Sequence, residues 1–325
     1  MIEVREDHEL KPFPVVLEAC ADELLSSWLR RHAAYYAVSE AALIAWLGLK
    51  VSTLRTVDHR FSLEQVGRFT RVLRCDPTCL VGMTHAGVPA EARLLTRQNR
   101  ALVCHSCVDQ HGAAGIHGVA LKSWIEAWRI TCRLCGGPLS EPGGSHDNPM
   151  SLREISSFGE RWWEGARVGE GLIERYVTGQ TSMLQAPVAL MRLLLLPSWY
   201  RPGQPFDGFY NGWLLNELIP GFDDHARRVK RRVNHGAIGS IPPALRVALL
   251  AGISLVAASP ASVIDYLRPA CRPIYTRHFE AFAAAAVQGL SPPIDIEIEK
   301  MGWPFVSLLM PKRTGRSIFS FQDVS

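Results

Sequence analysis

Apolar side chains recur at intervals of three and four residues along most of this chain, which is the pattern of one buried face of an α-helix. Residues 21–31 predict the first such helix, with acidic residues near its start and arginines further on, as the helix dipole favours. The residues expected on its buried face are Leu24, Leu25, Trp28 and Leu29.

The next apolar segment resembles a helix-turn-helix element. Residues 39–47 predict a helix that is capped by Ser39 and ended by Gly48, and Leu54 and Val57 are spaced as inward residues of a following helix. Four residues before the turn glycine, where that motif usually has a small residue, this chain has Ile44. An ordinary helical hairpin is therefore an equal alternative.

Two further helix starts follow. Residues 62–73 open with a capping box formed by Ser62 and Gln65. Asp76 and Pro77 are typical of an N-cap and a first helical position.

Beyond a linker at residues 141–149, the pattern is helical again. Helices are expected at 151–166, 169–178, 186–196, 211–219, 223–233, 242–251 and 260–268. The sequence therefore predicts a mainly α protein with a helical N-terminal domain (1–100) that contains the helix-turn-helix-like element, a small zinc-binding module (101–142) and a helical C-terminal domain (150–325).

Composition agrees with a folded protein, since 47% of the 325 residues are hydrophobic and 20% are charged. The longest apolar run, Val247 to Ala258, is shorter than the roughly 20 residues that cross a bilayer. The first residues lack the pattern of a signal peptide. We therefore expect a cytoplasmic protein without a membrane partner.

Four of the eight cysteines form two Cys-x-x-Cys pairs, Cys104 with Cys107 and Cys132 with Cys135. Two such pairs present four thiolates to one tetrahedral ion, so the spacing predicts a single structural Zn²⁺ site with no open coordination position. Gly136-Gly137-Pro138 is expected to form a sharp turn after the second pair.

Histidines near the first pair leave a mixed ligand set open, with His105, His111 or His117 in place of a cysteine. A redox role for the pairs is less favoured, because two pairs coexist without a thioredoxin-like strand-to-helix context. The other cysteines are expected to be small core residues: Cys20, Cys75, Cys79 and Cys271.

The segment between the pairs contains a helical stripe of apolar residues that is expected to pack over the metal site. Its members are Leu121, Trp124, Ile125 and Trp128.

The net charge of +4 is unevenly distributed. Residues 61–140 contain nine basic and five acidic side chains, and residues 221–325 contain thirteen and eight. Two basic clusters are candidates for contact with nucleic-acid phosphates. They are Arg93, Arg97 and Arg100, and Arg227, Arg228, Lys230, Arg231 and Arg232. A solvated helix face or an acidic protein partner explains the second cluster equally well.

No catalytic motif is recognisable in the sequence. A Ser/His/Asp arrangement, a phosphate-binding glycine loop, an H-E-x-x-H motif and a nucleophile elbow are all missing. We therefore expect a protein that is not an enzyme.

Several of these motifs together resemble the TniQ family of transposition targeting proteins, which includes TnsD-type target selectors and the TniQ proteins of CRISPR-associated transposons. The resemblance covers about residues 12–140. It is carried by Pro14, Asp22 to Arg31, Met83-Thr84, Cys104-His-Ser-Cys107, Trp124, Trp128 and Cys132-Arg-Leu-Cys-Gly-Gly-Pro-Leu139. Many members have a histidine where Cys135 stands and a further cysteine pair after it, so one zinc ion rather than two is expected here.

The resemblance implies a non-enzymatic adaptor. Such proteins recognise target DNA or an RNA-guided CRISPR effector complex and recruit an AAA+ ATPase, which in turn brings the transposase; some act as homodimers. The alternative is a zinc-containing helix-turn-helix transcription regulator, which would bind a palindromic site as a dimer and need no transposition ATPase.

Overall fold

The computed structural model describes residues 11–86, 88, 102–140, 160–179, 186–199, 212–229 and 241–289. Within these ranges the chain is mainly helical, and its β pairs are isolated bridges. It divides into two compact units, Met1–Glu154 with Ile238–Pro243, and Ile155–Ala237 with Ala244–Ser325. The first unit contains both the N-terminal helices and the cysteine pairs, which the sequence analysis assigned to separate domains.

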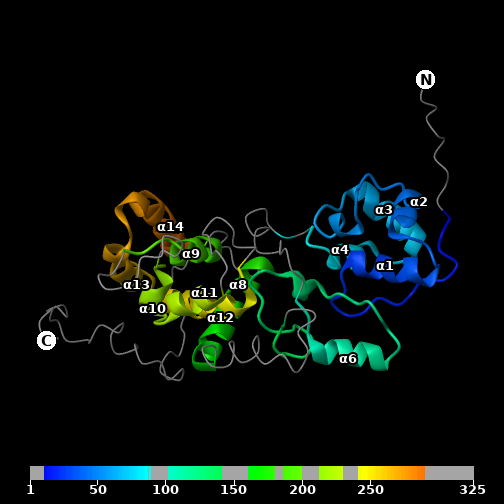
Figure 1. The fold of residues 1–325 in the computed structure, drawn as a ribbon. Helices are drawn as coiled ribbons and strands as arrows, with labels where there is room; N and C mark the ends of the chain where they lie inside the picture. The colour runs from blue at the N-terminus through cyan, green and yellow to red at the C-terminus, as the bar shows by residue number, and fades with distance from the viewer. Residues whose placement is uncertain are drawn as a thin grey trace, which may run out of the picture. The chain divides into compact units, whose positions relative to one another are not determined.

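Unit 1 contains five α-helices and two 3₁₀ turns among the described residues (Figure 1). They are α1 (Leu25–Tyr35), α2 (Glu40–Trp46), η1 (Leu54–Thr56), α3 (Leu63–Leu73), α4 (Pro77–Gly82), α6 (His105–Ala113) and η3 (Lys122–Ile125).

Helix α1 begins later than the sequence predicted and runs further, to Tyr35. Asp22 adopts a left-handed backbone conformation (φ 58°) and Glu23 forms a β-bridge with Leu121, so neither residue is helical. The four residues predicted for the buried face are all buried. The helix starts after Leu24, whose side chain offers no cap. Instead, Asp58 accepts hydrogen bonds from the backbone N–H (2.9 Å) and the hydroxyl (2.6 Å) of Ser26.

Helix α2 is capped by Ser39 and is followed by Gly48 at φ 62°, as predicted. The helix expected after this turn is only the single 3₁₀ turn η1, so the element lacks a second α-helix of recognition length. Leu54 is fully buried, as predicted, but its N–H donates to the Glu40 carboxylate (2.8 Å) and holds this segment to the start of α2.

Helices α3 and α4 form as predicted. Both hydrogen bonds of the capping box at Ser62 and Gln65 are present, and Asp76 caps α4, which has Pro77 in its first turn. Phe69 is fully buried in the core that α1 to α4 share.

The prediction for the four remaining cysteines is only partly correct. Cys271 is buried, and Cys75 is half-buried against the unit 1 core. Cys20 is also half-buried, but Cys79 is exposed. Cys79 lies in α4, a helix of six residues in which Leu80 is the buried residue, so the neighbouring position faces solvent.

Unit 2 is built from helices (Figure 1). Those described are η4 (Glu160–Trp162), α8 (Trp163–Val177), α9 (Ala186–Leu194), α10 (Leu215–Leu218), α11 (Phe222–Val229), α12 (Pro243–Ala258), α13 (Pro260–Leu267), η6 (Arg268–Ala270), η7 (Pro273–Tyr275) and α14 (Thr276–Gly289).

Four of these elements differ from the sequence prediction. The helix expected at 211–219 is only the four residues of α10 among the described residues. The two helices expected at 151–166 and 169–178 are one helix from residue 163 onward, and residues 151–159 lie outside the described ranges. Helix α12 continues to Ala258 instead of ending at residue 251. Helix α14, which packs against α9, was not predicted.

The backbones of α8 and α12 approach each other closely where the two helices cross. A Cβ atom on Gly169 of α8 would lie 2.1 Å from the carbonyl oxygen of Leu250 in α12. Only glycine allows the two backbones to approach so closely.

None of the described helices is by itself long and apolar enough to cross a bilayer. The segments Leu245–Ala258 and Pro260–Ala270, which meet at 118°, satisfy the length and composition criteria only when they are taken together.

Candidate metal centre

The first cysteine pair lies at the start of α6. Cys104 is the N-cap residue and Cys107 lies in the first turn, where the N–H of Val108 donates to the carbonyl of Cys104 (3.0 Å). Residues three apart at a helix start lie on the same side, so both sulfur atoms point to the same place. Both side chains are buried.

The second pair lies in a tight turn. The N–H of Cys132 donates to the carbonyl of Gly137 (2.7 Å), and the N–H of Gly136 donates back to the carbonyl of Cys132 (2.8 Å). Gly136 has φ 72°, which explains the glycine at this position. The N–H of Gly137 points at Cys135 Sγ (3.4 Å). The sharp turn predicted from Gly136-Gly137-Pro138 is therefore present.

The two pairs meet. The sulfur atoms of Cys104 and Cys135 are 3.3 Å apart, those of Cys107 and Cys132 are 3.5 Å apart, and all four lie within 4.8 Å of one another. A tetrahedral site with Zn–S bonds of about 2.3 Å places its sulfurs about 3.8 Å apart, which falls inside this range. Disulfides would need about 2.05 Å. The four cysteines can therefore hold one metal ion.

The three candidate histidines do not belong to this cluster. The group of ligand atoms that come together in the described part of the chain consists of the four cysteines. His117 is exposed, and His105 and His111 are half-buried. The mixed Cys/His alternative is therefore not the arrangement that the structure presents.

Burial and one hydrogen bond shift the pKa values of the clustered thiols in opposite directions. Burial raises the pKa of Cys104 to about 11 and also raises the pKa of Cys107, whereas the hydrogen bond from the Gly137 N–H lowers the pKa of Cys135. Buried thiols release their protons when a metal ion replaces them, so binding is coupled to proton release.

Apolar side chains enclose the cluster. Leu102, Leu121, Trp124 and Leu139 pack with three of the cysteines, and the Cys135 side of the cluster is exposed. The predicted stripe at residues 121–128 is buried, but it is not an α-helix, since only Lys122–Ile125 forms a 3₁₀ turn.

Long-range hydrogen bonds explain this difference. The N–H groups of Lys122 and Ser123 donate to the carbonyl (2.6 Å) and the carboxylate (3.1 Å) of Asp22, and the carbonyl of Trp124 accepts from Leu102 (3.0 Å). Leu102 thereby occupies the Trp124 carbonyl, which would accept a helical bond, and Glu126 has an extended backbone (φ −73°, ψ 119°) that ends the turn.

The acidic segment before α1 thus holds the metal module, a role that the sequence analysis missed. Leu24 N–H donates to the carbonyl of Ala120 (2.9 Å), and the hydroxyl of Ser27 accepts from the N–H of Ala120 (2.8 Å). Asp22 lies 3.7 Å from Arg133 inside the second cysteine pair. The helix dipole is a sufficient reason for acidic residues at this place in the sequence, and the local pattern contains no signal for contacts about 100 residues away.

The predicted nucleic-acid residues are only partly described. Arg227 is half-buried in α11 and forms an ion pair with Asp224 (3.0 Å), and Arg228 is exposed. Six others lie outside the described residues: Lys230, Arg231, Arg232, Arg93, Arg97 and Arg100.

Comparisons of the chain with protein-family models, curated proteins and solved structures found no match.

Proposed function

We propose that this chain is a non-enzymatic targeting adaptor of transposition, which recognises target DNA or an RNA-guided CRISPR complex and recruits an AAA+ ATPase. The proposal starts from the sequence resemblance to the TniQ family.

One observation carries it further: residues of the resembling motifs, which are far apart in sequence, contact one another in unit 1. The N–H of Leu25 donates to the carbonyl of Met83 (3.0 Å). Asp22 pairs with Arg133, and Trp124 packs beside the cysteines. A chance resemblance would not select residues that contact one another across the sequence, so these contacts support the proposal.

We further propose that the cysteine cluster holds one structural zinc ion. Four thiolates complete a tetrahedral shell and leave no position for a substrate or a reacting water. The ion would hold α6 and the second cysteine turn together, and through Asp22 and Arg133 it would support the start of α1.

The test is whether an AAA+ ATPase is encoded beside the gene for this chain and associates with the chain. The tagged full chain should retain that ATPase in a pull-down with ATP, and a transposition assay in cells should lose targeted insertion when the chain is omitted. An unrelated AAA+ ATPase serves as the control.

The transcription-regulator alternative predicts a different result. Failure to retain the ATPase, together with dimeric binding to a palindromic duplex, would replace the adaptor proposal. The single 3₁₀ turn η1 in place of a second α-helix counts against that alternative.

A further inference from the structure

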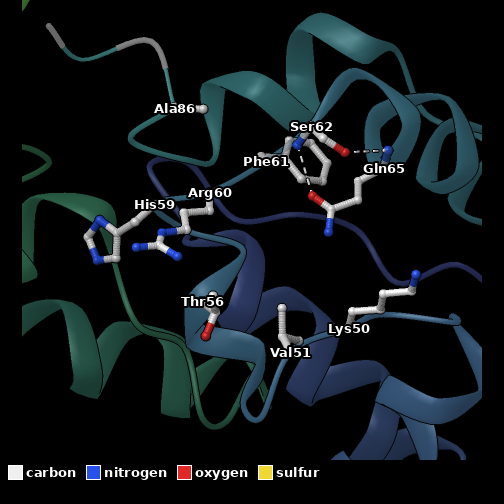
Figure 2. Close-up of a pocket in the computed structure, with 9 residues that line it drawn as sticks. All are labelled: Lys50, Val51, Thr56, His59, Arg60, Phe61, Ser62, Gln65 and Ala86. Carbon is white, nitrogen blue, oxygen red and sulfur yellow. Dashed lines mark hydrogen bonds between the residues drawn. The ribbon is translucent and has the colours of Figure 1, made fainter. Parts of the chain in front are cut away.

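Unit 1 contains a pocket of about 490 Å³ that includes none of the four clustered cysteines (Figure 2). Its walls come from the segment between α2 and η1, from η1 and the turn after it, from the start of α3, and from Ala86. The residues that matter chemically are Lys50, His59, Arg60, Phe61, Ser62 and Gln65. The volume falls within the range of about 300–1,000 Å³ that is typical of small-molecule sites.

The pocket is cationic. Two lysine or arginine side chains line it, no carboxylate does, and Figure 2 shows Lys50 and Arg60 on different sides of the space. Within the described residues, neither side chain pairs with a carboxylate, whereas Arg30, Arg31 and Arg68 of the same unit each do. The charges at the pocket are therefore available to an anion.

Neutral donors adjoin these cations. In the capping box, Gln65 Oε1 accepts from the N–H of Ser62 (2.8 Å), and Ser62 Oγ accepts from the N–H of Gln65 (3.2 Å). Because both oxygens act as acceptors there, the amide NH₂ of Gln65 and the hydroxyl proton of Ser62 are left to donate. Figure 2 shows the amide nitrogen of Gln65 on the side away from Ser62.

Two rings add flat surfaces. Phe61 is half-buried beside Phe69, with ring centroids 5.4 Å apart. His59 stacks on the buried ring of His85 at 5.5 Å, with 14° between the planes. Burial lowers the pKa of His85 to about 3, so the His85 ring stays uncharged at neutral pH. Rings held in this way are suited to stack with a planar group.

We propose that this pocket binds a nucleotide, with the phosphate between Lys50 and Arg60 and the base against Phe61 and His59. Cations from two sides and hydroxyl and amide donors match a phosphate, and the rings match a base. The inference goes beyond the adaptor proposal, because it assigns a ligand to a pocket that the adaptor proposal does not use. The nucleotide is either free or part of a nucleic-acid strand, and the two sources share this chemistry.

The test measures binding to the full chain. AMP is titrated by calorimetry and a labelled single-stranded dT oligonucleotide by fluorescence anisotropy, each at several salt concentrations. The variants are Lys50→Gln, Arg60→Gln and the double variant. The matched control is Arg71→Gln/Arg74→Gln, which removes the same charge from exposed positions outside the pocket lining.

Each single pocket variant should weaken binding about tenfold, as expected for the loss of one charged hydrogen bond. For the oligonucleotide, the slope of affinity against salt should also fall by about one per cation removed. Saturable AMP binding that depends on both residues identifies a free nucleotide, and the same dependence for the oligonucleotide alone identifies a strand.

The proposal is overturned if neither ligand binds, if neither affinity responds to Lys50 or Arg60, or if the control loses as much affinity as the double variant. The single variants keep the test valid should the double variant not fold. None of these outcomes bears on recruitment of the ATPase, which is measured separately.

Discussion

At the scale of single residues, buried polar side chains organise unit 1. Asp58 is fully buried and caps α1 from 32 residues away. Glu23, also buried, accepts from the Ser27 hydroxyl (2.9 Å) and from Arg31 (2.6 Å). Asp58 replaces a local cap that the sequence does not supply. Burying each carboxylate costs desolvation, which its hydrogen bonds offset.

The four clustered cysteines should behave as one unit. Cys104→Ser should reduce the zinc content from one ion per chain and lower the melting temperature, because an incomplete ligand set loses most of the binding free energy that supports folding. Elemental analysis and thermal unfolding provide the measurements. Cys79→Ser, at an exposed cysteine outside the cluster, is the control and should change neither value. Equal zinc content in all three proteins would contradict the structural-zinc proposal.

Asp58 should make stability depend on pH. Burial raises its pKa to about 6 from 3.8, although the Ser26 hydrogen bonds oppose this shift. The native chain therefore holds a proton that the unfolded chain has released, and its free energy of unfolding should fall as pH rises from about 4 to 6. At about 1.4 kcal/mol per pKa unit, this shift should lower the free energy of unfolding by about 3 kcal/mol between acidic pH and pH 7.

Asp58→Asn removes this contribution. The free energy of unfolding of the variant, minus that of the native chain, should increase between pH 4 and pH 7. Taking the difference cancels the effects of Asp223, whose pKa burial likewise raises to about 6, and of the thiols. Denaturant titrations across this pH range provide the values, and a difference that stays constant would refute the assignment.

At the scale of elements, local signals predicted some helix ends well and others poorly. The capping box at Ser62, the Asp76-Pro77 start and the Gly48 end are formed by neighbours in sequence, so the sequence contains the whole cause. The start of α1 depends on Asp58, 32 residues away, and on Ala120. The segment 121–128 depends on Asp22, about 100 residues away. Periodicity predicted which residues are buried there, but it did not predict where the backbone is helical.

The crossing of α8 and α12 should depend on one glycine. Gly169→Ala places a methyl group on the Leu250 carbonyl and should destabilise unit 2 by about 1–3 kcal/mol, the usual cost of overpacking. Gly171→Ala in the same helix is the matched control. Its Cβ meets no atom within 4 Å, so the substitution should be neutral or stabilise by up to about 1 kcal/mol through helix propensity. Chemical denaturation of both variants would show this contrast, and equal effects would contradict it.

At the scale of the whole molecule, the chain forms two compact units, and the candidate metal centre belongs to the first. The cysteine module shares a core of hydrogen bonds with the residues before α1, so the module and the N-terminal helices should unfold together. Unit 2 has its own core, which contains α9, α12 and α14.

Metal removal should therefore act on one unit. In calorimetry, a chelator should lower the unfolding temperature of one transition and leave the other unchanged, since the loss of a bound ion destabilises only the part that binds it. Gly169→Ala should move the second transition instead. A single transition, or a chelator that shifts both transitions equally, would contradict independent unfolding of the two units.

The sequence by itself determined the helical class, the pairing of four cysteines into one candidate site, and the caps of α2, α3 and α4, because periodicity, ligand spacing and capping act between near neighbours. The tertiary structure decided the rest. It showed that the cysteine module and the N-terminal helices form one compact unit, that residues 121–128 are held by Asp22 instead of forming a helix, and that Lys50 and Arg60 line one pocket. These features arise from contacts between distant residues, and a pattern along the chain does not contain them.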